Sequence, residues 1–176
     1  MRLVHSIIAI VFVLNSHSQV AHAQVLKGAV GAVPRFEEFS TEEKPASKRA
    51  PLVLVGDDRH WRTRLQRGYA GPVNFAGRYI LTYWGCGAEC LHGAALDTKT
   101  GAVHWLPGSV CCWGSYLESD SESAEEAPIS FRTDSRLIII KGMINETGIS
   151  GTHYFKFEGG QFLSILSVPW ALQESP

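Results

Sequence analysis

The sequence predicts an α+β fold: a mainly antiparallel β-sheet of about eight short strands with one short helix, stapled by disulfides. Three observations predict it. After Pro72, short apolar runs alternate with Gly, Asn and Asp turns. Before Pro72, a single segment has helical periodicity. The chain also has 4 cysteines behind an export-like N-terminus, a combination that favours disulfides.

Residues 1–23 have the pattern of a secretory signal peptide. Arg2 supplies a positive charge, Ile7–Leu14 supply a short apolar run, and Ala21-His22-Ala23 supplies a small-x-small cleavage site. We therefore expect an extracytoplasmic protein, periplasmic or secreted, after cleavage following Ala23. The apolar run is shorter than the roughly 20 residues of a membrane helix, and no later run approaches that length, so no membrane span is expected.

The remainder divides into a flexible N-terminal arm, residues 24–50, and a single β-rich globular domain, residues 51–176. The arm is rich in Gly, Ala, Pro, Glu and Lys. Its two aromatic residues, Phe36 and Phe39, are the side chains through which it would dock.

The one predicted helix follows a short strand-like segment, Pro51–Gly56. Asp57 or Asp58 can cap the helix, which is expected to end near residue 69 because glycines and a proline follow. Apolar side chains recur at every fourth position and form one stripe: Trp61, Leu65 and Tyr69.

The eight predicted strands follow in order, separated by turn residues: Gly77–Trp84, Leu91–Asp97, Ala102–Leu106, Val110–Ser115, Ile129–Arg132, Leu137–Lys141, Thr152–Glu158 and Gln161–Ser167. Gly77–Trp84 is apolar on both faces, which is typical of a central strand. Gly159-Gly160 supplies the positive-φ turn of a final hairpin.

The formal net charge of −1 excludes a general electrostatic attraction to nucleic acid. We expect no nucleic-acid partner on this ground. The oligomeric state does not follow from the sequence.

The four cysteines predict two disulfides, with the pairing left open: Cys86, Cys90, Cys111 and Cys112. One alternative is a local bond within the first pair, across a glycine-flanked turn, which leaves Cys111 and Cys112 either free or joined in a strained ring. The other joins each member of the first pair to one of the second. A zinc or copper site with His92 or His104 is a weaker alternative, because the cysteine spacing is not that of a usual zinc site.

Several motifs together resemble a family of uncharacterised exported bacterial proteins. They are Trp61-Arg62-Thr63-Arg64-Leu65, then Gly71-Pro72-Val73-Asn74-Phe75-Ala76-Gly77-Arg78-Tyr79, and then Trp84-Gly85-Cys86-Gly87-Ala88-Glu89-Cys90. They match the pattern RTRL, GPNFAGxY and WGCGxxC, except for the inserted Val73. The resemblance covers residues 57–105 and implies a bacterial, extracytoplasmic setting, but no activity.

Two groups of residues are candidate binding sites. Trp105, Trp113 and Tyr116 can stack on sugars or apolar ligands, or they can cover the disulfides and fill the core. Arg62 and Arg64, with two further arginines of the helix, can form an anion-binding face or a solvated face partly paired with Asp57 and Asp58.

The sequence therefore predicts a non-catalytic binding or envelope-associated protein, whose partner is an unknown envelope protein or glycan. We identify no catalytic set and expect no cofactor or metal. The alternative is a hydrolase of a cell-envelope component that uses Cys86 with His92 or His104.

Overall fold

The computed structural model describes residues 32–114 and 127–170, all of which except residue 32 belong to one compact unit, Val33–Pro176. The predicted signal peptide and Tyr116 lie outside the described residues.

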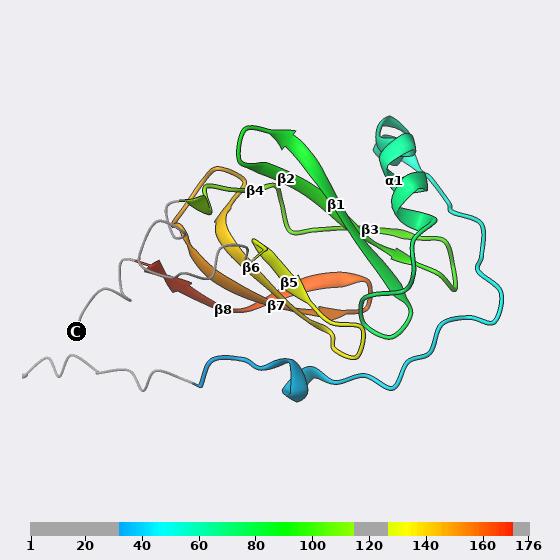
Figure 1. Ribbon diagram of the computed structural model, residues 1–176, viewed down its shortest axis with the longest axis horizontal. Helices are drawn as coiled ribbons and strands as arrows, with labels where there is room; N and C mark the ends of the chain where they lie inside the picture. The colour runs from blue at the N-terminus through cyan, green and yellow to red at the C-terminus, as the bar shows by residue number, and fades with distance from the viewer. Residues whose placement is uncertain (1–31, 115–126, 171–176) are drawn as a thin grey trace, which may run out of the picture. The chain divides into compact units, whose positions relative to one another are not determined.

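The predicted fold class is confirmed: the described residues form an eight-stranded antiparallel sheet and one helical segment (Figure 1). The strands are β1 (Tyr79–Gly87), β2 (Cys90–Asp97), β3 (Val103–Trp105), β4 (Val110–Cys111), β5 (Ile129–Phe131), β6 (Leu137–Ile144), β7 (Gly151–Glu158) and β8 (Gln161–Pro169). Each overlaps a predicted strand, because period-two alternation and turn residues are local signals.

Short β4 joins two halves of this sheet. The strand order is β1-β2-β4-β6-β7-β8, with β3 paired to β2 and β5 to β6. β4 contributes two residues, which pair with the start of β2 and the end of β6. The predicted hairpins β5–β6 and β7–β8 are both present, and Gly159 and Gly160 have positive φ values of 57° and 79°.

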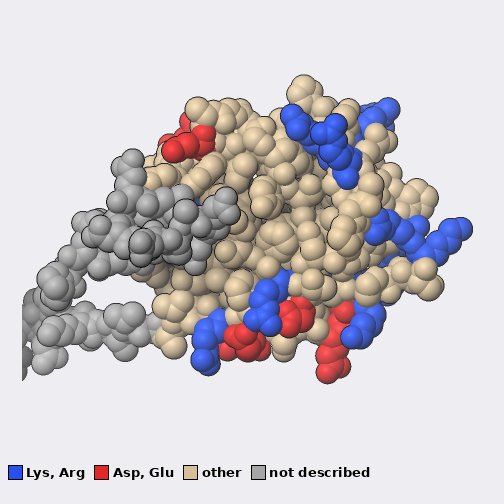
Figure 2. All heavy atoms as spheres, in the orientation of Figure 1, with Lys and Arg blue, Asp and Glu red and all other residues tan. Residues whose placement is uncertain are grey.

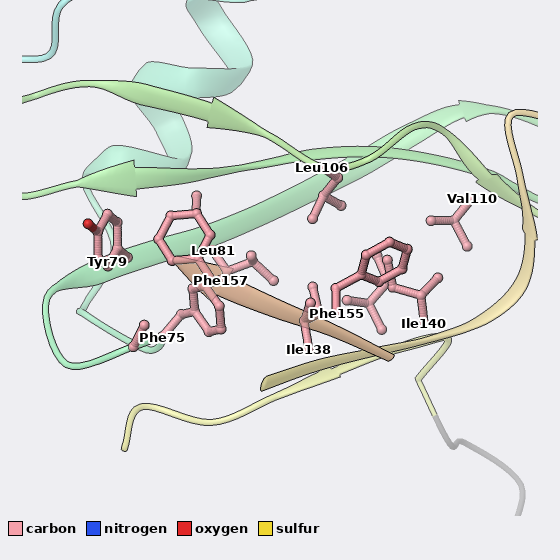
Figure 3. Packing of buried hydrophobic residues seen from close by; sticks show 12 residues of the cluster. Phe75, Tyr79, Leu81, Leu106, Val110, Ile138, Ile140, Phe155 and Phe157 are labelled. Carbon is pink, nitrogen blue, oxygen red and sulfur yellow. The ribbon is translucent and has the colours of Figure 1, made fainter. Parts of the chain in front are cut away.

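The main core lies between the two halves (Figure 3). Leu81 of β1 and Leu106 face Ile138 of β6 and Phe155 of β7 across this core. Because side chains alternate along a strand, the same strands also present residues to the opposite faces of the sheet.

The helical segment covers the outer face of β1, β2 and β3. It begins as a 3₁₀ turn, η2 (Gly56–Trp61), and continues as α1 (Arg62–Tyr69). Leu65 and Tyr69 are buried in a second core cluster and Trp61 packs against it, which confirms the predicted stripe. The carboxylate of Asp58 accepts the backbone N–H of Val55 at 3.1 Å at the start of the segment.

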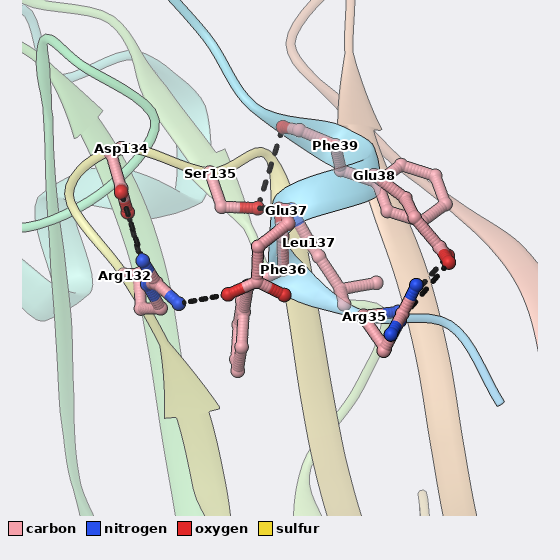
Figure 4. Close-up of polar contacts among 9 residues, drawn as sticks. All are labelled: Arg35, Phe36, Glu37, Glu38, Phe39, Arg132, Asp134, Ser135 and Leu137. Carbon is pink, nitrogen blue, oxygen red and sulfur yellow. Dashed lines mark hydrogen bonds and ion pairs between the residues drawn. The ribbon is translucent and has the colours of Figure 1, made fainter.

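The segment before the helix is held against the sheet by backbone and side-chain hydrogen bonds (Figure 4). It contains a 3₁₀ turn, η1 (Phe36–Phe39). The Ser135 hydroxyl lies 2.8 Å from the Phe36 carbonyl and 3.3 Å from that of Phe39, and the Arg136 N–H donates to the Phe39 carbonyl at 2.8 Å. These bonds differ from the loosely held arm that the composition predicts.

Two predicted elements are wrong in detail. Residues 51–55 form no strand, and Val53 makes one backbone bond to Gly101 instead. β1 is an edge strand of the sheet and not a central one. Its two faces are both covered, one by the helix and one by the other half of the sheet, so its apolar pattern resembles that of a central strand.

Candidate functional site

A shallow groove runs between α1 and the neighbouring edge strand β1. We call it the α1/β1 groove. It is lined by these residues: Arg64, Arg67, Gly68, Thr82, Tyr83, Trp84 and Gly85.

The floor of the groove is set by a close contact between helix and strand. A Cβ atom added to Gly68 would lie only 2.5 Å from the hydroxyl oxygen of Thr82. Only a residue without a side chain allows the two backbones to approach so closely. The contact places Arg64 and Arg67, one helical turn apart, beside the edge of β1.

The exposed charged side chains over α1 are mostly positive. Figure 2 shows Lys and Arg side chains gathered over α1, with the acidic side chains of this face lying elsewhere. Four arginines of the helical segment are exposed, and none has an ion pair with a described residue: Arg59, Arg62, Arg64 and Arg67. The predicted pairing with Asp58 is absent, because its side chain faces inward and is 7 % exposed.

Three tryptophans pack beneath the groove. The ring centres of Trp61 and Trp84 are 5.5 Å apart, and those of Trp84 and Trp105 are 5.9 Å apart. The indole N–H of Trp105 donates to Asp58 at 2.9 Å. The indole N–H of Trp84 is buried and has no acceptor among the described residues. Leaving such a donor unsatisfied costs about 1–3 kcal/mol.

The tip of the β1–β2 hairpin carries a disulfide. The sulfur atoms of Cys86 and Cys90 are 1.95 Å apart, and the Cα atoms are 5.1 Å apart. The structure thus adopts the local pairing, because the hairpin turn brings these two residues within disulfide range. Residues 85–89 are exposed, so the bond braces a part of the hairpin beyond the core.

The expected second disulfide is absent from the described residues, since Cys111 and Cys112 are thiols, which is the outcome that the local pairing left open. Cys111 is buried at the end of β4, and a bond to the adjacent Cys112 would close a strained ring. Burial, together with a hydrogen bond from Cys112, raises the pKa of Cys111 to about 11. A thiol with so high a pKa is a poor nucleophile at neutral pH.

The other predicted site residues are separated. Trp105 lies in the helix-side cluster, whereas Trp113 packs against the core between the two halves. Tyr116 lies outside the described residues. Of the two arginines predicted to bind ligand, Arg64 lines the groove, and Arg62 is exposed outside it.

The residues of the hydrolase alternative are also separated. Cys86 is bonded to Cys90, so it offers no thiolate here. His92 packs beside Trp61 with the helix-side cluster, and His104 packs beside Phe157 in the other core. Within the described residues, no group of three His, Cys, Asp or Glu side chains is placed to hold a metal ion.

A second depression lies beside Arg78, and its charged groups satisfy one another. The Arg78 guanidinium contacts the carboxylates of Glu43 at 2.5 Å and Asp97 at 3.1 Å, and donates to the Tyr79 hydroxyl at 2.7 Å. Asp97 also accepts the backbone N–H of Lys99 at 2.8 Å. Two carboxylates around one cation leave no net positive charge, so the α1/β1 groove is the better anion site.

The sequence does not predict the roles that Arg67, Gly68 and Trp84 have in the groove. The sequence places Arg67 on the basic helix face but indicates no groove, and it places Trp84 only in a strand. The sequence signal for Gly68 was present, since glycine inside a helix lowers stability and often marks close packing. The β1 edge itself carries no signal in a single sequence.

A comparison of the chain with models of known protein families, with curated proteins and with solved structures finds no match. Among the helices of the described residues, none has the length and apolar character needed to cross a membrane.

Proposed function

We propose that this chain is an exported, non-catalytic binding protein that holds an anionic partner in the α1/β1 groove. The observation that carries the proposal is the pair Arg64 and Arg67, which line one groove with no acidic side chain among its described lining residues. Guanidinium groups bind carboxylates and phosphates through paired hydrogen bonds. Exposure to solvent limits the energy of such contacts, so the affinity should fall as salt is added.

The other groups in the groove favour the same kind of ligand. Thr82, which also lines the groove, carries a hydroxyl that can donate to a ligand oxygen. Among the described residues that line the groove there is no Asp or Glu. A ligand rich in acceptor oxygens would therefore find donors and no repelling charge.

Export is part of this proposal. It is supported by the pattern of residues 1–23 and by the Cys86–Cys90 bond, since disulfides persist in oxidising compartments. N-terminal sequencing of protein from the extracytoplasmic fraction should begin at Gln24. An uncleaved chain confined to the cytoplasm would contradict it.

Binding is tested by fluorescence anisotropy with two labelled anions, a hexaglutamate peptide and an oligogalacturonate. We expect at least one to bind at low salt, and the double variant R64E/R67E to weaken its affinity about tenfold, or about 1.4 kcal/mol. The double variant R59E/R62E makes the same charge change outside the groove and should bind almost normally. Equal losses in both variants, or binding of neither anion, would overturn the groove as the site.

A further inference from the structure

The backbone of β1 has an open hydrogen-bonding edge beside the groove. In β2, Gly93 and Asp97 bond through their backbones to Leu106 and Ala102, on the side away from β1. The backbone N–H and C=O groups of the odd-numbered residues of β2 therefore point away from β1. Since odd residues of the two strands are register partners, the N–H and C=O groups of odd residues in β1 point to the open edge.

Part of this edge is already closed by nearby residues. Tyr79 pairs with Phe75 through both its N–H and its carbonyl. The side-chain amide of Asn74 accepts the N–H of Leu81 at 2.7 Å and donates to its carbonyl at 3.0 Å. Asn74 thus satisfies Leu81 as a neighbouring strand would.

Beyond Leu81 the edge is open. The edge-facing backbone groups of Tyr83 and Gly85 have no hydrogen-bond partner among the described residues. The braced Cys86–Cys90 tip lies directly after them. The open part holds a donor and an acceptor on each of two residues about 6.7 Å apart, which fits a partner strand of three or four residues.

The open edge and the basic groove coincide, because Tyr83 and Gly85 line the groove together with Arg64 and Arg67. A strand added to β1 would lie about 4.8 Å from it, with alternate side chains on the face that α1 covers. Those side chains would meet the two arginines. Alternate carboxylates complement this charge.

We infer that the partner is an extended acidic polypeptide segment, which adds to β1 as a short strand and places alternate carboxylates against Arg64 and Arg67. This inference rests on the proposed anion-binding function and names its ligand class. A glycan supplies anionic groups as well, but it has no backbone that alternates N–H donors and carbonyl acceptors at strand spacing.

The test uses a labelled, end-blocked pentapeptide with Glu at alternate positions and Thr between them. Two further versions carry N-methyl groups, one on the odd-numbered and one on the even-numbered amides. In a strand, alternate N–H groups face the neighbouring strand, so one version should lose about tenfold in affinity while the other binds like the parent. R64E/R67E should weaken the parent peptide, and R59E/R62E should not.

Each other outcome separates the two proposals. Equal affinity of all three peptides, with loss only in R64E/R67E, would overturn strand addition and leave anion binding in place. Binding of oligogalacturonate more tightly than the peptide would overturn the polypeptide as ligand. Failure of every anion to bind would overturn the proposed function itself.

Discussion

His104 shows how its surroundings set the charge of a single side chain. Its ring lies edge-on to Phe157 at 5.7 Å and to Tyr79 at 5.9 Å. A Cβ atom added to Gly160 would lie 2.5 Å from this ring, so the glycine makes room for it. Burial lowers the pKa of His104 below its ordinary value, and the positive charge of Arg78 lowers it further. The negative charge of Asp97 and a backbone hydrogen bond at Gly160 raise this pKa, but they do not cancel the effect of burial.

We expect His104 to make the protein less stable in mild acid. The histidine pKa is depressed in the folded state, so below about pH 6.5 the unfolded chain binds the proton more readily than the folded one. The free energy of unfolding should therefore decrease as the pH falls from about 7.5 to 5.5. Urea unfolding at several pH values measures this decrease, which should be smaller in His104→Gln.

Titration of His104 by NMR is the direct control for that experiment. The ring should titrate below about pH 6.5. A midpoint above that value would contradict the sign of the effect, whatever the stability data show.

Among the elements, α1 and β1 pack at a distance that leaves no room for a larger side chain at Gly68. Gly68 approaches Thr82 so closely that an added methyl group would meet all three heavy atoms of the Thr82 side chain at 2.5–2.7 Å. The rest of the interface is apolar, with Leu65 and Tyr69 facing Ile80 and Trp84. The packing of α1 therefore requires a close backbone approach at Gly68, and buried apolar side chains stabilise the rest of the interface.

Gly68→Ala should lower the free energy of unfolding, although alanine is the better helix former. The gain in helix propensity is at most about 1 kcal/mol, whereas overpacking costs about 1–3 kcal/mol. Urea unfolding measures the balance. Gln66→Ala, at an exposed position of the same helix, is the matched control and should be neutral. A stabilised Gly68→Ala variant would show that the helix moves away from β1 at little cost.

The strands were predicted well and their places in the sheet were not, for one physical reason. Alternation along β7 and the glycine pair before β8 are local, so their existence follows from the sequence. The edge position of β1 depends on which strands lie beside it, and its apolar pattern reports only that both faces are covered. The unpaired state of Cys111 likewise depends on its neighbours in the fold.

The candidate site could be predicted only in part. Arg64 was identified because a basic helix face is visible in the sequence. Gly68 and Trp84 take their roles from contacts between α1 and β1. The side chain of Asn74 bonds the backbone of Leu81, seven residues later in β1. These contacts join separate segments of the chain, so the periodicity of apolar residues within one segment does not predict them.

At the scale of the whole molecule, residues 36–43 connect distant parts of the domain. Ser135, which is 1 % exposed, lies within hydrogen-bond distance of two carbonyls of η1 and accepts the N–H of Leu137 at 3.2 Å. Arg132 pairs with Glu37 at 2.6 Å, but both side chains are largely exposed. Glu43 reaches Arg78 at the start of β1.

We expect Ser135→Ala to destabilise the protein by about 1–3 kcal/mol, because the buried N–H of Leu137 and the partly buried carbonyls of η1 lose the Ser135 hydroxyl as a partner. Arg132→Ala should cost less than about 1 kcal/mol, since exposed ion pairs contribute little. Equilibrium unfolding in urea compares the two variants. A larger loss in Arg132→Ala would mean that charge, and not the buried hydroxyl, holds this segment.

Asn74 has a consequence for how copies of this protein behave at high concentration. A long open edge strand allows identical chains to join side by side and grow into insoluble fibres. With Leu81 occupied by an amide side chain, the stretch of β1 that a second copy can join is too short for such growth. One asparagine thus limits side-by-side joining at β1 to a segment of a few residues.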